Sequence, residues 1–516
     1  MPEGHRKSAS TVHFVFPAEW NIISALKETS DPGTFTAPDY DTLVDAPALM
    51  GHFDVTRFEV EGKPHYFAAT PVGAFSTENA KKLTDVLGKA AVSESAIFGG
   101  LPYDKYVYFY FILPAEEKTG EGGALEHLNS HVAFVPAGDF PMEPVAWTAA
   151  HEFFHLWNVK RIRPVEMWPY DYRRENATPL LWVSEGFSNY YANRTLLAIG
   201  LNSEKRFLER IARTITMVET SDARAYISPA EASISDWVPN KVFPTDYYMQ
   251  GQNLGALLDL SIRHDTRGKS SLDDVMRGLF REFYQRGKGF STEDMIGLIN
   301  RLTRRDYHDF YRRYVSGVEA PPYDTIYGYA GYRVEKTTRR LPVPLGFSGR
   351  FGEHGVSVTN IVERSPAAEG GLLVGDVITK RNGQEMKPGM KLIPGTNTTV
   401  KLTIERAGQE RELSLTIGPP RELAVWTVVE LPKPTSEQLK IREGWLKGSN
   451  QSRPRLPGFE ARPSAREGGR RQCLEPLDPC LSGQLPKHRW SAAVVKPSRR
   501  IYCTAAAGDS DTAALL

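Results

Sequence analysis

The sequence predicts an α+β protein of several domains, and three observations carry that prediction. Residues 12–115 hold aromatic and β-branched runs bounded by Pro and Gly, which is typical of strands. Residues 144–317 repeat apolar side chains at steps of three and four, as helices do. Residues 340–420 alternate apolar and polar side chains again, which indicates a second β-rich domain. A chain of 516 residues is also longer than one hydrophobic core usually serves.

The first β-rich part, residues 12–115, includes the runs HYFAATPVGAF and KYVYFYFILP. The helical part contains four strongly periodic segments, at residues 144–160, 179–200, 251–264 and 271–286. Gly200 stands where a glycine commonly ends a helix, and Ser291 with Asp294 predicts a capping box before a further helix. We therefore assign residues 116–335 to one mainly helical domain.

The second β-rich domain is predicted from three period-two sets, namely Val356 and Val358, then Val400, Leu402 and Ile404, then Leu413, Leu415 and Ile417. Thr435 and Gln438 predict a capped helix within residues 421–447. Residues 448–516 are rich in Arg, Pro, Gly and Ser without a steady period, so we expect them to be disordered. The abrupt change of composition suggests a foreign or mistranslated end.

The overall composition excludes several classes of protein. Hydrophobic residues make up 41% and charged residues 24%, which is ordinary for a globular protein. A net charge of +1 argues against a nucleic-acid partner. The sequence has no apolar run of about 18 residues, so no membrane span is predicted. All three cysteines lie in the last 44 residues, so we expect neither disulfides nor thiolate metal ligands in the globular part.

Two histidines and a glutamate interrupt the apolar segment AAHEFFHLWNVKRIRP, residues 149–164. Residues four apart lie on one helix face with Cβ atoms about 5–6 Å apart, so His151 and His155 can direct imidazole nitrogens at one metal ion. Glu152 is then within reach of a water on that ion, which is the H-E-x-x-H arrangement. Buried polar groups need partners, and the apolar surroundings therefore argue against a chance match.

A catalytic zinc ion usually takes three protein ligands and one water. The nearest downstream glutamates are Glu166 in a Pro-rich loop, Glu175 in a polar run, and Glu185 in the segment LLWVSEGFSNYY. We choose Glu185, because a carboxylate among aromatic side chains is the one most in need of a cation.

These segments, in this order, resemble the glycyl aminopeptidase family of zinc metallopeptidases, the sixty-first metallopeptidase family. Its members carry a PDZ domain and are related to aminopeptidase N and leukotriene A4 hydrolase. The resemblance covers residues 12–446 and implies a thermolysin-like, mainly helical zinc peptidase domain of the gluzincin type. The shorter ligand spacing of the broader superfamily ends at Arg174, whereas the longer spacing of this family ends at Glu185.

Two further segments resemble parts of the family's substrate site. GGALEH, residues 122–127, resembles its substrate strand, which implies that Glu126 binds the free α-amine of a peptide and that the backbone near Gly123 and Ala124 pairs with it. DYYMQGQNLGALLDL, residues 246–260, resembles a second segment and implies that Tyr248 donates to the oxyanion, with Tyr247 as the alternative. Gln250 stands where the family usually has Lys.

The expected activity is therefore a zinc-dependent aminopeptidase that acts on peptides with a free N-terminus. Zn²⁺ would lie on His151, His155 and Glu185, and Glu152 would act as the general base. A preference for small residues such as Gly or Ala is implied by the resemblance alone. The basic residues Lys160, Arg161 and Arg163 are interpreted as a solvated helix end, with contact to the substrate as the alternative.

The segment PLGFSGR resembles the carboxylate-binding loop of a PDZ domain at Leu345, Gly346 and Phe347. The following GVSVTNIVERSPAAEGGLLVGDVITKRNG resembles the PDZ strands with a short helix after Ser365. The resemblance implies that a C-terminal peptide binds there by adding a strand to the sheet. The alternative is a PDZ fold used only for packing.

Compared with the family, the chain begins well inside the N-terminal β domain, so we expect a truncated N-terminus. The first twenty residues lack the apolar core of a signal peptide, which predicts a cytoplasmic chain as written. A periplasmic or secreted location is the alternative if the N-terminus is truncated.

Two other functions compete with the aminopeptidase. One is a catalytically impaired, truncated peptidase that serves as a PDZ adaptor, which the complete set of His151, His155, Glu152, Glu185 and Tyr248 argues against. The other is a zinc hydrolase that acts on something other than a peptide, for which an amine anchor at residue 126 would have little use.

Overall fold

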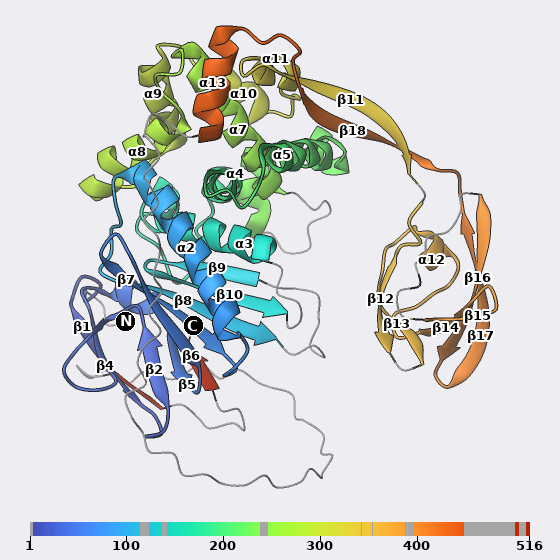
Figure 1. The fold of residues 1–516 in the computed structure, drawn as a ribbon, viewed down its shortest axis with the longest axis horizontal. Helices are drawn as coiled ribbons and strands as arrows, with labels where there is room; N and C mark the ends of the chain where they lie inside the picture. Colours follow the sequence, from blue (N-terminus) through green and yellow to red (C-terminus); the bar gives the residue numbers. More distant parts are fainter. Residues whose placement is uncertain are drawn as a thin grey trace. The chain divides into compact units, whose positions relative to one another are not determined.

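The computed structural model describes residues 4–113, 123–136, 142–237, 246–341, 343–352, 354–387, 390, 397–447, 501–504 and 512–515. The chain divides into two compact units, residues 1–333 with 428–516, and residues 334–427. Figure 1 shows both units and labels many of their helices and strands.

The N-terminal part of the first unit consists of two small sheets. Strands β1 (Ser10–Val15), β3 (Lys27–Glu28) and β4 (Thr34–Ala37) form one sheet, and β2 (Asn21–Ser24) and β5 (Ala48–Gly51) belong to the other. The short helix α1 (Tyr40–Val44) connects β4 to β5. Strands β19 (Ile501–Thr504) and β20 (Thr512–Leu515) pair with β1 and β5, although the sequence predicts disorder there. The rest of that predicted disordered tail, residues 448–500, 505–511 and 516, lies outside the described residues.

A five-stranded sheet follows and positions one wall of the site. Its order is β6-β7-β8-β10-β9, from β6 (Asp54–Val60), β7 (Lys63–Thr70), β8 (Tyr106–Leu113), β9 (Gly123–His127) and β10 (Ser130–Pro136). The central strand β8 is buried on both faces because successive side chains alternate: Tyr108 belongs to the main core with the helices, and Phe109 to a second core with Leu49 of β5. Strand β9 is at one edge and pairs with β10.

The region predicted to be strand-rich also contains a long helix that the sequence analysis does not anticipate. Helix α2 (Thr77–Phe98) begins at its N-cap Ser76 and ends at Gly99, which has a left-handed φ of 87°. It buries a stripe of small and aliphatic residues that includes Leu83, Leu87 and Ala91. Helices α2 and α3 (Met142–Phe154) pack together beside this sheet (Figure 1).

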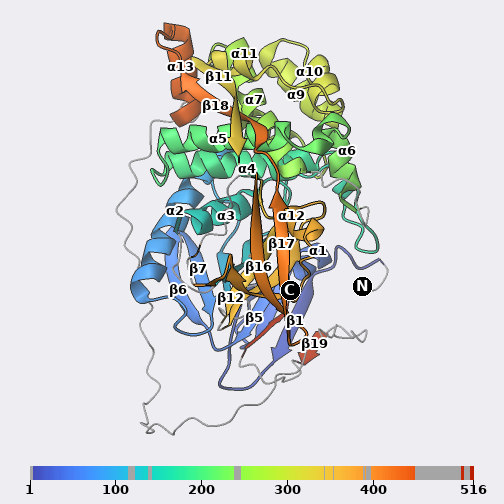
Figure 2. The same ribbon diagram turned by 90° about the vertical axis from the view of Figure 1, so that its right-hand side faces the viewer.

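The rest of the first unit is helical, as predicted. Its α-helices are α4 (Leu181–Ala198), α5 (Glu204–Glu219), α6 (Pro229–Ile234), α7 (Tyr247–Asp265), α8 (Leu272–Glu282), α9 (Thr292–Thr303), α10 (His308–Tyr314), α11 (Tyr323–Gly328) and α13 (Ser436–Lys447). Short 3₁₀ turns are η2 (Val165–Met167), η3 (Asp222–Ala225), η4 (Ser235–Trp237) and η5 (Tyr284–Arg286). Helices α4, α5 and α7 contact one another, and α4 also contacts α3 (Figure 2).

Three predicted helix ends are confirmed. Gly200 follows the C-cap of α4 with a φ of 76°. Ser291 and Asp294 form the capping box of α9. Thr435 and Gln438 exchange side-chain and backbone hydrogen bonds at 2.8 and 3.2 Å at the start of α13.

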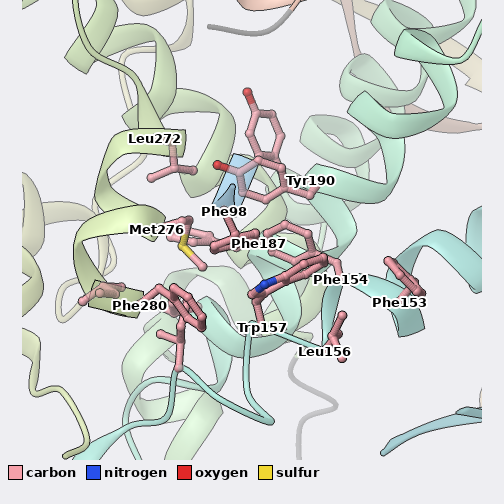
Figure 3. Packing of buried hydrophobic residues seen from close by; sticks show 14 of the residues in the cluster. Phe98, Phe153, Phe154, Leu156, Trp157, Phe187, Tyr190, Leu272, Met276 and Phe280 are labelled. Atoms are coloured by element: carbon pink, nitrogen blue, oxygen red, sulfur yellow. The ribbon is translucent and has the colours of Figure 1, made fainter. Parts of the chain in front are cut away.

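The core of the first unit is rich in aromatic side chains and includes Phe153, Phe154 and Trp157 of the segment that also holds the two histidines (Figure 3). The rings of Phe98 and Trp157 stack with centroids 4.6 Å apart, and those of Phe154 and Tyr191 stack at 4.2 Å. Buried aromatic side chains contribute most to core stability because each removes a large area from water. This core therefore fixes α2, α3 and α4 relative to one another.

The second unit is a small β domain with the expected alternation. Its sheet runs β12-β13-β14-β16-β17, with β15 paired to β14. Its elements are β12 (Phe347–Gly352), β13 (Gly355–Ile361), α12 (Pro366–Glu369), β14 (Val377–Arg381), β15 (Gln384–Glu385), β16 (Thr398–Arg406) and β17 (Gln409–Ile417). The period-two residues form its core, although Leu413 is only partly buried. Strands β11 (Tyr332–Leu341) and β18 (Arg421–Glu430) form a separate two-stranded ribbon.

Among the described residues of the whole chain, no helix is both long and apolar enough to cross a membrane.

Candidate active site

Helix α3 carries His151 and Glu152 on its last turn. It ends at Phe154, six residues earlier than the segment 144–160 predicts, and His155 lies in the turn that follows. The amide of His155 still donates to the carbonyl of His151 at 3.3 Å, so the one-turn spacing is kept. The Nε2 atoms of the two imidazoles are 2.9 Å apart. Both rings therefore face one point.

Glu185 of α4 completes a group of three donors. Its Oε2 lies 3.2 Å from Nε2 of His151 and 3.2 Å from Nε2 of His155. The other two glutamates considered from the sequence lie elsewhere: Glu166 accepts a bond from the Thr178 hydroxyl at 2.9 Å, and Glu175 is exposed. The structure thus brings Glu185 to the imidazole pair and leaves the alternatives apart.

Two glycines allow α4 to place Glu185 there. A Cβ atom on Gly186 would overlap the backbone of Gly251 in α7, and a Cβ atom on Gly251 would overlap the carbonyl oxygen of Trp182. Helices approach this closely only where side chains are absent. The pair sets α4 against α7 directly beside Glu185, and three residues before Gly251 the same helix α7 presents Tyr248.

Carboxylates surround the two imidazoles on more than one side. The carboxyl oxygens of Glu126 and Glu152 and a ring nitrogen of His155 lie within 4.8 Å of one another. Burial, together with Glu126 and Glu185, raises the pKa of Glu152 well above its usual range. Burial lowers the pKa of His155, but Glu185 and Glu126 outweigh it and raise the pKa to about 10. The carboxylate of Glu185, buried beside the two imidazoles, is the charged group that needs a cationic partner.

The donor set fits a zinc ion. The backbone carbonyl of Asn158 can only accept, so the 2.6 Å contact fixes a proton on Nδ1 of His155 and makes Nε2 the atom that would bind the ion, in place of the proton that the raised pKa holds there. Zinc–nitrogen bonds of about 2.0–2.1 Å in a tetrahedral site place donors ~3.3 Å apart. The observed separations of 2.9 to 3.2 Å among the two Nε2 atoms and Oε2 of Glu185 are close to that spacing.

The two adjacent tyrosines of α7 have different surroundings. Tyr247 is 7% exposed and belongs to the core, whereas Tyr248 is 38% exposed and stacks beside His151 with ring centroids 6.2 Å apart. Burial and the nearby Glu185 raise the pKa of Tyr248, so its phenol stays protonated and can donate. Gln250, two residues after Tyr248, is buried, and its Oε1 has no hydrogen-bond partner among the described residues.

The edge strand β9 holds the residues expected to meet a substrate. Its pairing with β10 sets Glu126 opposite His131 and Ala124 opposite Ala133, with Gly123 at the start of the strand. Within the described residues β9 pairs only with β10, so its other edge is free of strand partners. An extended peptide can add to an edge of this kind through backbone hydrogen bonds.

The interpretation of the basic run as a solvated helix end is wrong for two of its three residues. Lys160 and Arg161 are 7% and 3% exposed. Nζ of Lys160 lies 2.5 Å from Oδ1 of Asp45, and Arg161 donates to the Leu128 carbonyl and the Asn129 side chain in the turn after β9. The bonds of Arg161 hold the turn after β9 to the segment that follows His155. The sequence alone does not predict that Lys160 and Arg161 are buried, because the burial of a cation depends on partners that are distant in the chain.

In the second unit, the loop expected to bind a carboxylate lies between the ribbon strand β11 and β12. Leu345 is buried, Gly346 has a left-handed φ of 81°, and Phe347 begins β12 opposite Ile361. A Cβ atom on Gly346 would overlap Ser365, the N-cap of α12. Only glycine can therefore hold this loop shape.

Comparisons with known proteins agree with this arrangement. Residues 145–254 match the family model of the M61 glycyl aminopeptidases, and residues 1–52 match the M61 peptidase N-terminal domain. Residues 328–417 match a PDZ domain. A search of curated proteins finds no match.

Among solved structures, the chain is similar to an aminopeptidase N family protein from Idiomarina loihiensis. The two are 23% identical, with 86% of this chain and 80% of that chain covered and a TM-score of 0.69, so they share a fold. Weaker matches are an M1 zinc metallopeptidase from Deinococcus radiodurans (18% identity, 61% and 64% covered, TM-score 0.38) and yeast LTA4 hydrolase (14%, 63% and 49%, 0.42).

The M61 matches cover the N-terminal β region and the helices that carry the histidines and Glu185, and the PDZ match covers the second unit. The chain therefore carries M61 glycyl aminopeptidase regions at residues 1–52 and 145–254, and it is a peptidase with a PDZ domain.

Proposed function

We propose that the protein is a zinc-dependent aminopeptidase with a thermolysin-like catalytic domain. The observation that carries this proposal is the convergence of Nε2 of His151, Nε2 of His155 and Oε2 of Glu185 within 3.2 Å of one another, with Glu152 and Glu126 beside them. Zinc, when bound by these three donors, would lower the pKa of a water toward about 7 and polarise the scissile carbonyl.

The residues around the proposed zinc position each have a separate role in the reaction. Glu152, the neighbour of His151, takes the proton of the attacking water and passes it to the leaving amine, as a general base and then a general acid. The phenol of Tyr248 donates to the developing oxyanion. The free edge of β9 at Gly123 and Ala124 aligns the peptide.

Glu126 makes the proposed enzyme an aminopeptidase rather than an endopeptidase. Its carboxylate lies close to Glu152 and His155, where the first residue of a peptide would place its ammonium group. The proposed preference at that residue is for Gly or Ala, and the match to the glycyl aminopeptidase model supports Gly. The experiment that tests the function is hydrolysis of glycyl and alanyl arylamides before and after zinc removal by a chelator, with activity expected only with zinc.

Replacing Glu126 by Gln should raise KM for glycyl arylamides roughly 10–100-fold, since a bond to a charged group contributes about 1.5–3 kcal/mol. The zinc content should not change, because Glu126 is not among the three donors. N-acetylglycyl arylamide, which has no ammonium group, is the matched control substrate. If the variant keeps the wild-type preference for the free amine over the acetylated substrate, Glu126 does not bind the amine.

We propose that the PDZ unit binds the C-terminal carboxylate of a peptide at the loop of Leu345, Gly346 and Phe347, with the peptide added to the edge strand β12.

The alternative function, a PDZ adaptor without peptidase activity, can be distinguished from the enzyme by experiment. It predicts peptide binding to this unit together with zinc binding but no arylamide hydrolysis.

A further inference from the structure

We propose that Asn158 is a positioning residue that ties the second histidine and the glutamate of the metal site together. This inference rests on the proposed zinc site. Asn158 is 1% exposed and lies three residues after His155, in the turn that ends α3. It contacts both His155 and the first turns of α4, which carry Glu185.

The backbone of Asn158 orients the imidazole of His155. Its carbonyl oxygen accepts the bond from Nδ1 of His155 at 2.6 Å. That bond sets the tautomer and the ring angle, so Nε2 faces His151 and Glu185. Ser188 of α4 adds a second contact to the same Nδ1 at 3.3 Å.

The side chain of Asn158 holds the other partner. Its Nδ2 lies 2.9 Å from the carbonyl of Val183, 2.9 Å from the carbonyl of Ser184 and 3.2 Å from the hydroxyl of Ser188. Two carbonyl acceptors require the amide nitrogen, not its oxygen, to face α4. Val183 and Ser184 directly precede Glu185, so the amide fixes the position of that part of α4 relative to His155.

The residue after Asn158, Val159, has a strained backbone conformation. Val159 has a φ of 147°, a region that β-branched residues rarely adopt and that costs about 1–3 kcal/mol. Val159 is also buried, and Lys160 and Arg161 after it are bound to Asp45 and to the turn after β9. The bonds of Asn158 on one side and of these cations on the other keep the strained turn in place.

The test is the zinc dissociation constant of the full chain, measured by competition with a chromophoric chelator, together with the thermal midpoint of the zinc-free protein. Asn158→Asp puts an oxygen against two carbonyls, and Asn158→Ala removes the amide but keeps the backbone carbonyl. Both variants should weaken zinc binding about 10–100-fold, the usual effect of losing a group that orients a ligand. Asn202→Asp, a buried asparagine whose Nδ2 has no partner among the described residues, is the matched control and should bind zinc as the wild type does.

A role in folding alone would lower the midpoint and leave the zinc affinity unchanged. If either Asn158 variant folds and binds zinc within threefold of the wild type, the inference is wrong while the zinc site stands. If the wild-type protein itself binds no zinc, the proposed function fails, and this inference fails with it. If Asn158→Asp does not fold, the zinc dissociation constant of Asn158→Ala is compared with that of the wild type instead.

Discussion

Glu152→Gln should lower kcat for glycyl arylamides about 10²–10⁴-fold, the usual contribution of a positioned general base. Gln has the same shape but cannot take a proton from water. Glu152 is not among the three donors formed by His151, His155 and Glu185, so the variant should still bind zinc. Steady-state hydrolysis and metal analysis on the same preparation measure both quantities.

The matched control is Glu175→Gln, which changes a glutamate that is exposed and apart from the donors. It should leave both kcat and zinc content unchanged. A Glu152→Gln variant with more than a tenth of the wild-type kcat would show that another group removes the proton.

Gly251→Ala should destabilise the fold by about 3 kcal/mol and lower activity by roughly 10²-fold in whatever protein folds. The added methyl group would overlap the carbonyl oxygen of Trp182, which is backbone and cannot move aside without shifting α4. That shift would move Glu185 away from the imidazoles, and it would move Tyr248 on α7 as well. Denaturant unfolding and arylamide hydrolysis report the two effects.

Gly297→Ala in α9 is the control for this substitution. A Cβ atom at Gly297 would meet only Nη1 of Arg301, at 3.9 Å. Ala is the better helix former by about 1 kcal/mol, so this variant should be as stable as the wild type or slightly more so. If both variants behave alike, close approach of α4 and α7 is not what Gly251 provides.

Much of the fold follows from local patterns in the sequence. The period-two sets of the PDZ unit form its core, and the caps of α9 and α13 occur where the residues predict them. Helix α2 is missed because its charged and small residues form a weakly apolar stripe between two strong strand signals. The end of α3 at Phe154 is missed because it depends on bonds that Asn158 makes to residues of α4.

In the candidate site too, some features follow from the local sequence and others depend on residues that are distant in the chain. The spacing of His151 and His155 is a property of one helical turn, so the sequence can predict that they share a face. The choice between Tyr247 and Tyr248 needs the packing of α7, because adjacent residues differ only in the direction they face. The burial of Lys160 and Arg161 depends on Asp45 and on the turn after β9, which are distant in sequence.

Zinc stoichiometry in the wild type and in Glu185→Gln tests the account most directly. Equilibrium dialysis followed by elemental analysis should find about one zinc ion per wild-type chain, because two imidazoles and a carboxylate make a complete protein ligand set. The variant should hold little or none at the same free zinc concentration. A Glu185→Gln protein that binds zinc as tightly as the wild type, or a wild-type protein without zinc, would contradict the account.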